Sequence, residues 1–527
     1  MATTVLTVRH DQAEQSGYVH SSIPLAPSEA SSPSPTRTLG VPPEFSSFAE
    51  EIGFVCVCSM GQLLFAVHLA HSFVNQLTFI EALGTSTLNT PWLIGSFLVA
   101  NGVSVVISGS FADLVSPKYL TCGALVWLSI WSFIGAFSIS PERIILFFIA
   151  RSMAGLSVGT LCAAAMSMLG RVYRPGLRKN RVFSLMGAMI PMGFAIGAIQ
   201  GGAFSCHLHW VFGSTALLAL FCIGGAFWCI PSLPVDSVSL KDFDYAGASA
   251  AMLGFGLLIF GLTQGSPTHW SPYTYALVIV GLASLATFGL IEKKVRRPLI
   301  DNRLWLTPGF LPVIVSYFLG YGAFAGAWQF FAVRFLLTIQ HTSPVITACY
   351  LLPVGISGTL ASWVVSRLLH IMPGHWILMG SMLAFATGPA FFLPQTSGTM
   401  HWALSIPGFV ISTFGPDMSF AAVSVFITSN VPRSYQGAAG SLVITAQNLS
   451  TAVFAALGDT VGEKVTKMAD STLDLGALRA IWWMSLATVM TGALVCACFV
   501  RIPKSEEKEH SLSKDQLLIK DDDRRDV

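Results

Sequence analysis

Five polar side chains lie inside long apolar runs of this sequence, where they could bind protons or polar groups of a ligand. Arg151 follows Phe-Phe-Ile-Ala, and Asp417 follows Phe-Gly-Pro. His68, His71 and Asn75 are spaced three and four residues apart, so a helix would carry them on one face. A charge at the centre of a bilayer costs roughly 2.5–3.5 kcal/mol on insertion scales. A charge retained in such a run therefore indicates a function or a specific partner.

Proton transfer is the chemistry that these residue types favour. Asp417 is the only acidic residue that the sequence places deep in an apolar run. A carboxylate in low dielectric takes up a proton more readily than one in water. Histidine changes its charge near neutral pH. We predict that Asp417 carries a proton, with Arg151, His68 and His71 tuning it. The alternatives are a static pair for Asp417, an arginine that donates to backbone carbonyls, and histidines that only pack.

A stripe of aromatic residues is predicted in a further apolar run. Tyr317, Tyr321, Phe324 and Trp328 lie at offsets of four, seven and eleven residues, which is one side of a helix. An aromatic and nearly uncharged surface suits amphipathic organic molecules better than sugars or highly charged metabolites. Packing inside a helix bundle or against lipid is the alternative interpretation.

The composition indicates that most of the chain lies in a membrane. A soluble domain has roughly 25% charged residues, whereas this chain of 527 residues has 11% and is 53% hydrophobic. A helix needs about 20 apolar residues to cross a bilayer. The sequence predicts an all-α polytopic membrane protein with about fourteen such helices. They lie near 53–77, 92–112, 119–139, 144–169, 182–204, 210–230, 245–264, 273–292, 309–333, 345–370, 376–394, 402–427, 437–458 and 480–500.

The charges of the loops predict the orientation. The loop 171–181 carries five basic residues and no acidic one, and the loop 292–307 is also basic. Loops on the opposite side carry few basic residues. Because cytoplasmic loops are enriched in lysine and arginine, both termini are predicted in the cytoplasm. Residues 1–48 are polar and residues 503–527 are charged, so both are expected to be disordered cytoplasmic tails.

A weak internal repeat divides the predicted helices into two halves. An offset of 257 residues aligns spans four and five with spans twelve and thirteen, and sets Thr160 opposite Asp417. We predict six-helix bundles at 49–231 and 308–502, with two linker helices at 232–307. Paired halves that enclose a site at the midplane are typical of transporters. The repeat also suggests Asp417 as the partner region of Arg151.

Glycines stand at regular spacing where helices could touch. Gly193, Gly197, Gly201 and Gly202 form a flat face in the fifth run, and Gly155 follows Arg151 by four residues. Small residues let membrane helices approach closely. Gly109, Asp113 and Lys118 mark the loop after the second run, where Asp113 could pair with a cation or a helix N-terminus.

These motifs resemble those of the major facilitator superfamily, and in particular the fungal fourteen-span drug:proton antiporters of the aminotriazole-resistance-like branch. The resemblance covers about residues 50–500 and includes the segment Phe414–Phe420 and the loop Tyr173–Asn180. Ala198 stands where antiporters of the family carry a proline. The resemblance implies alternating access around a central cavity lined by spans one, four, nine and twelve. It implies that Arg151 acts in proton coupling or substrate binding.

The predicted function is secondary active export of small amphipathic organic compounds by proton antiport, at the plasma membrane and as a monomer. The expected partners are the substrate, protons and membrane lipid. The alternative is a transporter of the same fold for ammonium, borate or a basic amino acid, in the plasma or vacuolar membrane. A non-transporting receptor is disfavoured by the short tails.

Other classes lack their sequence signatures. The net charge of +2 gives no support for nucleic-acid binding. The ten cysteines do not stand at metal-site spacing with histidine, and no phosphate-binding loop occurs. We therefore predict no enzyme activity, no cofactor and no metal.

Overall fold

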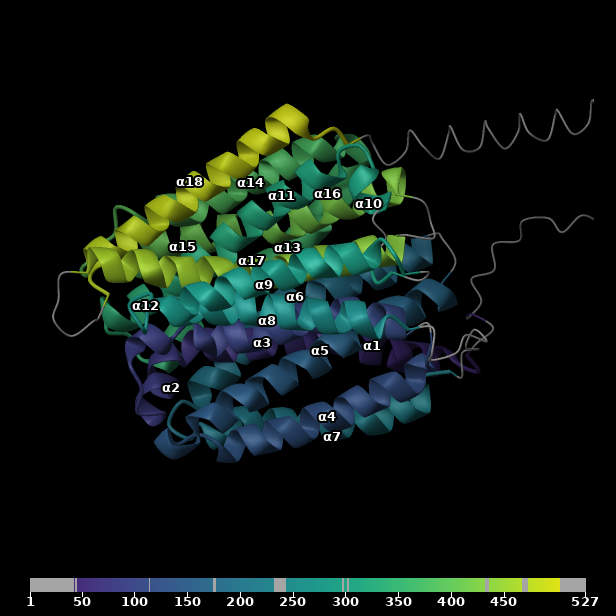
Figure 1. Cartoon of the computed structure of the whole chain (residues 1–527), viewed down its shortest axis with the longest axis horizontal. Helices are drawn as coiled ribbons and strands as arrows, with labels where there is room; N and C mark the ends of the chain where they lie inside the picture. The colour runs from purple at the N-terminus through teal and green to yellow at the C-terminus, as the bar shows by residue number, and fades with distance from the viewer. Residues whose placement is uncertain are drawn as a thin grey trace, which may run out of the picture. The chain divides into compact units, whose positions relative to one another are not determined.

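The computed structural model describes residues 42, 45–112, 114–173, 177–231, 243–295, 298–300, 303–431, 436–466 and 473–502. The described residues all belong to one compact unit. Every regular element of the described residues is helical (Figure 1). Fourteen helical segments of this described part are long and apolar enough to cross a membrane. The predicted all-α polytopic fold is confirmed.

The first six long helices and the three short helical elements between them run in chain order as follows. They are α1 (Phe48–Val74), α2 (Gln76–Ala82), η1 (Thr87–Asn89), α3 (Trp92–Phe111), α4 (Pro117–Phe137), η2 (Pro141–Arg143), α5 (Ile144–Val172), α6 (Leu177–Ala203) and α7 (His209–Cys229). A hairpin of α8 (Tyr245–Gly265) and α9 (Pro272–Glu292) follows.

The remaining elements begin with the short helix α10 (Arg303–Leu306). They continue with α11 (Phe310–Tyr321), η4 (Gly322–Gln329), α12 (Phe330–Thr338), α13 (Pro344–Ile371), α14 (Gly374–Phe392), α15 (His401–Ser412), α16 (Phe414–Asn430), α17 (Gln436–Val465) and α18 (Leu475–Phe499).

Local side-chain caps set several helix starts. The Ser47 hydroxyl accepts a hydrogen bond from the backbone N–H of Glu50 at the start of α1. Asp244 and Asp474 cap α8 and α18 in the same way, at 2.8 and 2.7 Å. Such caps satisfy N–H groups that the first helical turn leaves without a partner.

The helix α11–η4–α12 contains a feature that the sequence did not predict. Residues Gly322–Gln329 form a π-helix between two α-helical parts of the same span. A π-turn is wider than an α-turn, is rare, and frequently occurs at functional sites. Two glycines of this segment, Gly322 and Gly326, face α17, and a side chain at Gly326 would collide with the Thr451 carbonyl.

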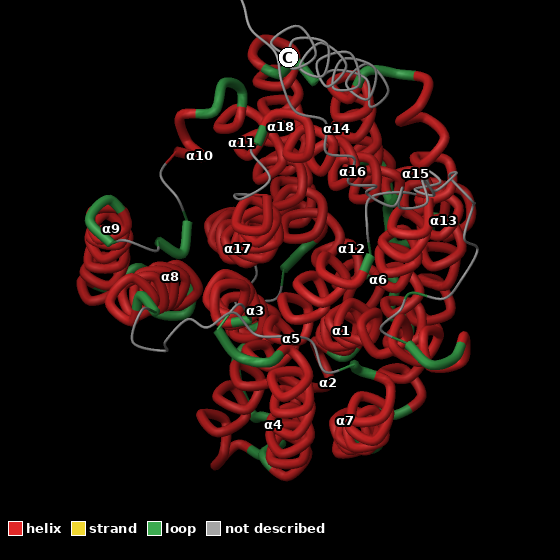
Figure 2. The backbone as a smooth tube through the Cα atoms, turned by 90° about the vertical axis from the view of Figure 1, so that its right-hand side faces the viewer, coloured by secondary structure: helices red, strands yellow, loops and turns green. Residues whose placement is uncertain are grey.

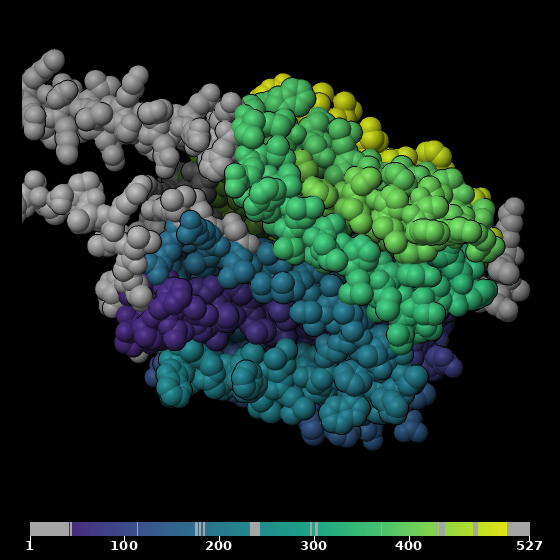
Figure 3. Space-filling view, turned by 180° about the vertical axis from the view of Figure 1, so that it is seen from behind, coloured from purple at the N-terminus to yellow at the C-terminus, as the bar shows by residue number. Residues whose placement is uncertain are grey.

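The helices pack as two groups that meet along two seams. In the first group α1 packs on α6, and α5 packs on α3 and α4. In the second group α14 packs on α16 and α18. The groups meet where α6 lies on α13 and where α3 lies on α17 (Figure 2). The space-filling view shows the blue first group bordering the green second group (Figure 3).

Candidate functional site

The side chains of His68 and His71 on α1, and of Asn75 at its end, are fully buried and turn toward neighbours of the first group. The His71 Nε2 atom lies 3.2 Å from the Gln200 Oε1 atom on α6. The Asn75 amide donates to the Gly201 carbonyl at 2.9 Å. His68 points instead toward α3, where its ring stacks on that of Phe97 with the centroids 5.1 Å apart. His71 and Asn75 thus share a face toward α6, whereas the His68 ring, 6.1 Å from that of His71, turns toward α3.

Arg151 lies on α5 and ties it to two other helices. Its Nη2 atom donates to the Ser72 hydroxyl of α1, and to the Leu93 carbonyl of α3 at 2.6 Å. Its guanidinium carbon lies 5.5 Å from the centroid of the Phe97 ring and 5.9 Å from that of Phe212. The residue is 3% exposed. This geometry favours the alternative named above, in which Arg151 donates a hydrogen bond to a backbone carbonyl.

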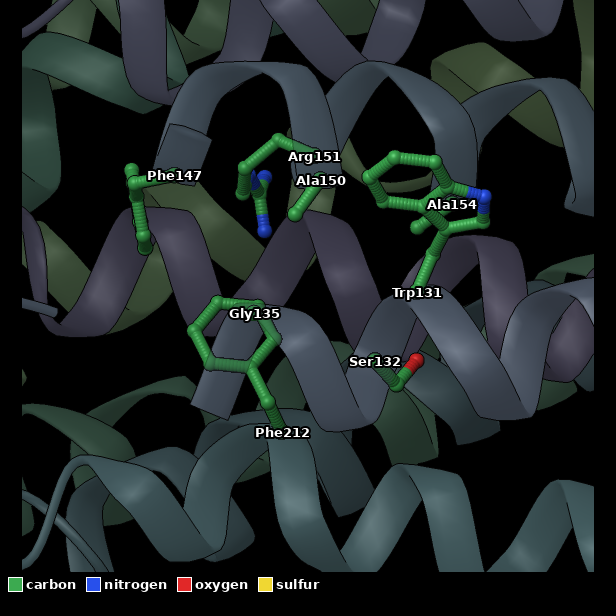
Figure 4. A pocket seen from close by; sticks show the side chains of 8 residues that line it. All are labelled: Trp131, Ser132, Gly135, Phe147, Ala150, Arg151, Ala154 and Phe212. Carbon is green, nitrogen blue, oxygen red and sulfur yellow. The ribbon is translucent and has the colours of Figure 1, made fainter. Parts of the chain in front are cut away.

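A small crevice beside Arg151 lies between α4, α5 and α7 of the first group. Figure 4 shows Phe147, Phe212 and Trp131 around the arginine. Ser132, Gly135, Ala150 and Ala154 complete the lining. Because every lining residue belongs to the first group, this crevice is separate from both seams.

Asp417 lies in the first turn of α16 and is partly exposed. The Ser362 hydroxyl of α13 donates to its Oδ1 atom at 3.0 Å. The helix α11, which carries Tyr317 and Tyr321, packs on α16. The expectation that Asp417 is the partner of Arg151 is therefore corrected. Each residue has partners in its own helix group, because the repeat relates the helices without bringing them into contact.

The aromatic stripe packs within the second group. The Tyr317 hydroxyl donates to the Gln447 Oε1 atom, and the Gln447 amide donates to the Tyr321 hydroxyl, both at 2.8 Å. Phe324 packs on Phe385 of α14 with the ring centroids 5.1 Å apart. The Trp328 ring, which is fully buried, packs on rings of α14 and α15.

A second deep acid was missed by the sequence reasoning. Asp459 of α17 is 1% exposed, so Asp417 is not the only acidic residue deep in a span. Its Oδ1 atom lies 3.7 Å from the Nη1 atom of Arg334, which is buried on α12. The sequence reasoning ended this span at residue 458, whereas α17 continues to Val465.

The comparisons with known proteins identify the family. The model of the Major Facilitator Superfamily matches residues 58–455, most of the chain. The chain belongs to the major facilitator superfamily. The predicted membership is confirmed, and transporters rather than enzymes are the class that the family and its named relatives support.

Three fungal proteins are similar in sequence to this chain over most of its length. A low affinity ammonium transporter of Saccharomyces cerevisiae is 28% identical, over 89% of this chain and 92% of its own length. Efflux pump terJ of Aspergillus terreus is 27% identical, over 86% of this chain and 88% of its own length. An aminotriazole resistance protein of Saccharomyces cerevisiae is 25% identical, over 87% of this chain and 86% of its own length.

A solved structure agrees with the fold of this major facilitator. A POT family transporter in complex with 5-aminolevulinic acid superposes with a TM-score of 0.60 at 13% identity. The match covers 86% of this chain and 97% of the other. At this identity the likeness concerns the fold alone.

The glycine face of this major facilitator lies at two helix contacts. A side chain at Gly193 or Gly197 would approach the backbone of α1 to 2.6 Å, and Gly201 faces the Asn75 amide. Gly202 faces α13 across a seam instead. Gly155 lies directly against the backbone of Phe97 on α3.

Of the predicted loop motif Gly109, Asp113 and Lys118, only the first and last residues lie in the described part of the chain. Gly109 faces the Ser441 hydroxyl of α17, which a Cβ atom would approach to 3.0 Å. The Lys118 ammonium lies 5.1 Å from the centroid of the Phe227 ring. Asp113 lies outside the described residues, so its predicted latch stays a prediction.

A polar contact at the α3–α17 seam also escaped the sequence reasoning. The Asn448 amide donates to the Asn101 Oδ1 atom at 2.7 Å, and Asn101 donates to the Gly155 carbonyl at 3.2 Å. The Thr445 hydroxyl donates to the Gly102 carbonyl at 2.7 Å. Hydrogen bonds across membrane helices contribute about 0.6 kcal/mol on average. These contacts therefore align the two groups without locking them.

Replacing Arg151 by methionine is expected to lower thermal stability while leaving the pH-gradient dependence of the remaining transport unchanged. The change removes donors that link α1, α3 and α5, at a cost of roughly 1–3 kcal/mol for a stranded acceptor. Thermal unfolding of the purified protein measures the first effect. Arg181→Met, at an exposed arginine of α6, is the control. Loss of the pH dependence with normal stability would instead assign Arg151 to the proton pathway.

Proposed function

We propose that this chain exports small amphipathic organic compounds by proton antiport. The observation that carries the proposal is the state of Asp417. It is a partly exposed carboxylate within a span, and its hydrogen-bond partner is the neutral Ser362 hydroxyl. Among the described residues no ion pair to Asp417 occurs. An acid held in this way can bind a proton in one state and release it in another.

The surroundings of Asp417 support an organic substrate. Tyr317, Tyr321 and Gln447 carry phenol and amide groups on α11 and α17, the helices that pack on α16. Sites for amphipathic ligands combine aromatic walls with a few polar groups. The name of the relative efflux pump terJ agrees with this class. In this proposal the α1 histidines and the buried rings of Phe324 and Trp328 hold the two helix groups in shape.

The proposed transport cycle follows from the two seams. The first bundle (49–231) and the second (308–502) rock against each other along α3–α17 and α6–α13, where glycine contacts keep the helices close. The protein works as a monomer in the plasma membrane, with both termini in the cytoplasm, as the basic loops favour.

A second candidate, transport of ammonium, is favoured by the relative named a low affinity ammonium transporter. Reconstituted vesicles with an imposed pH gradient distinguish the two. The substrates are a panel of fluorescent lipophilic compounds and, separately, ammonium. Gradient-driven movement of the organic compounds supports the proposal. Movement of ammonium alone supports the alternative, and movement that is indifferent to the gradient contradicts antiport.

A further inference from the structure

The two helix groups meet at the end of the bundle opposite Phe45 and Ile502, which we call the far end. An even number of crossings, fourteen in the described chain, returns the chain to the side on which it started, so Phe45 and Ile502 lie at the same end. The helices α2 and α12 lie at the far end (Figure 1). At the far end the Gln76 amide of α2 donates to the Phe330 carbonyl of α12 at 3.4 Å. The Phe73 ring packs on the Phe330 ring at 5.3 Å. The far end is therefore closed in this structure.

A buried ion pair lies in this closed region. The side chains of Arg334 and Asp459 are each 2% exposed, and their nearest charged atoms are 3.7 Å apart. Arg334 also points across to the first group, where its Nη2 atom lies 3.5 Å from the Thr87 carbonyl of η1. A buried pair is costly to desolvate, and removal of one member strands the other charge. Both members belong to the second group, so Asp459 holds the Arg334 guanidinium in the position from which it reaches the Thr87 carbonyl of the first group.

The inserted hairpin α8–α9 reaches the same region. Its turn binds Glu463, which lies one helical turn beyond Asp459 on α17. The Ser266 hydroxyl donates to the Glu463 Oε2 atom at 2.7 Å, and the His269 Nδ1 atom lies 2.6 Å from Oε1. The turn holds His269 and Trp270 at positive φ, a conformation that these residues rarely adopt.

The hairpin is also fixed to the first group. The Trp92 indole N–H of α3 donates to the Gln264 Oε1 atom of α8 at 3.2 Å. The Trp92 ring packs on Phe260 with the centroids 4.9 Å apart. The hairpin thus has one anchor on α3 and one on α17, on the two sides of a seam.

We propose that Arg334, Asp459 and Glu463 form the closure of the far end, and that the inserted hairpin is a strap that holds this closure shut. When the far end opens, α12 moves away from η1 and Arg334 leaves the Thr87 carbonyl. Separation of α3 from α17 also pulls on both anchors of the hairpin. The strap therefore stabilises the closed state relative to the open one. This inference requires only alternating access, and it holds for either substrate class.

Thiol labelling tests the closure. Leu88, which is buried next to Thr87, is replaced by cysteine as a reporter, and labelling by a soluble maleimide is followed by peptide mass spectrometry. Cys206 is exposed in the loop between α6 and α7 at the same end, and it serves as an internal standard. In the background of Arg334→Met with Asp459→Leu, which removes both charges together, labelling of the reporter is expected to rise about tenfold. Labelling equal to that of the parent would overturn the closure.

The strap is tested separately by Glu463→Gln, which weakens the anchor and leaves the ion pair in place. Reporter labelling is expected to rise by roughly threefold to tenfold. Glu81→Gln, at an exposed acid of the same end, is the matched control and should leave labelling unchanged. If Glu463→Gln labels like the control, the hairpin is not a strap. Monodisperse elution of each variant shows that increased labelling does not come from unfolding.

Discussion

Replacing Asp417 by asparagine is expected to reduce transport driven by a pH gradient to the level of protein-free vesicles. Asparagine keeps the size of the side chain and can still accept from the Ser362 hydroxyl, but it cannot bind and release a proton. Exchange of labelled for unlabelled substrate across the membrane needs no net proton movement, so it should persist. The two assays on one preparation therefore separate lost coupling from lost folding.

Two companion variants sharpen this result. Asp417→Glu keeps a titratable carboxyl group and should retain part of the gradient-driven transport. Glu142→Gln removes an exposed acid outside the proposed pathway and should behave like the unchanged protein. Undiminished dependence on the gradient in Asp417→Asn would remove Asp417 from the coupling role and direct attention to Asp459.

The number of spans could be predicted from the sequence because bilayer thickness fixes the length of an apolar helix. The family could be predicted as well, because its motifs combine local patterns in a fixed order. The π-helix at Gly322–Gln329 could not, because its apolar residues fit an α-helix equally well. It depends on the approach of α17 to Gly326, which is a tertiary contact.

The partners of the charged residues were harder to predict than their positions. Which neighbour a side chain meets depends on the rotation of its helix about its axis, and this is set by packing. Arg151 thus meets Ser72 and Leu93 rather than Asp417. The predicted spans end at residues 333 and 458, just before Arg334 and Asp459. In the structure α12 continues to Thr338 and α17 to Val465, so the two charges pair inside the protein.

Replacing Gly155 by valine is expected to abolish most of the folded protein. A Cβ atom at this position would overlap the backbone of Phe97, so α3 and α5 would have to move apart. The Asn101 amide also donates to the Gly155 carbonyl at 3.2 Å, and that hydrogen bond would be lost. Overpacking alone typically costs 1–3 kcal/mol, and a collision with backbone leaves no side chain that can yield. We expect a loss of about 3 kcal/mol or more.

Gly170→Val in the same helix is the matched control, because a Cβ atom there meets nothing within 4 Å. Valine has a slightly better helix propensity than glycine, so this variant should fold as well as the parent. Yield of monodisperse protein and the midpoint of thermal unfolding measure both variants. Equal losses in the two would contradict a specific requirement for glycine at the α3–α5 contact. A loss confined to Gly155→Val would instead locate the requirement at the α3–α5 contact, which positions both Arg151 and the Asn101 hydrogen bond to the second group.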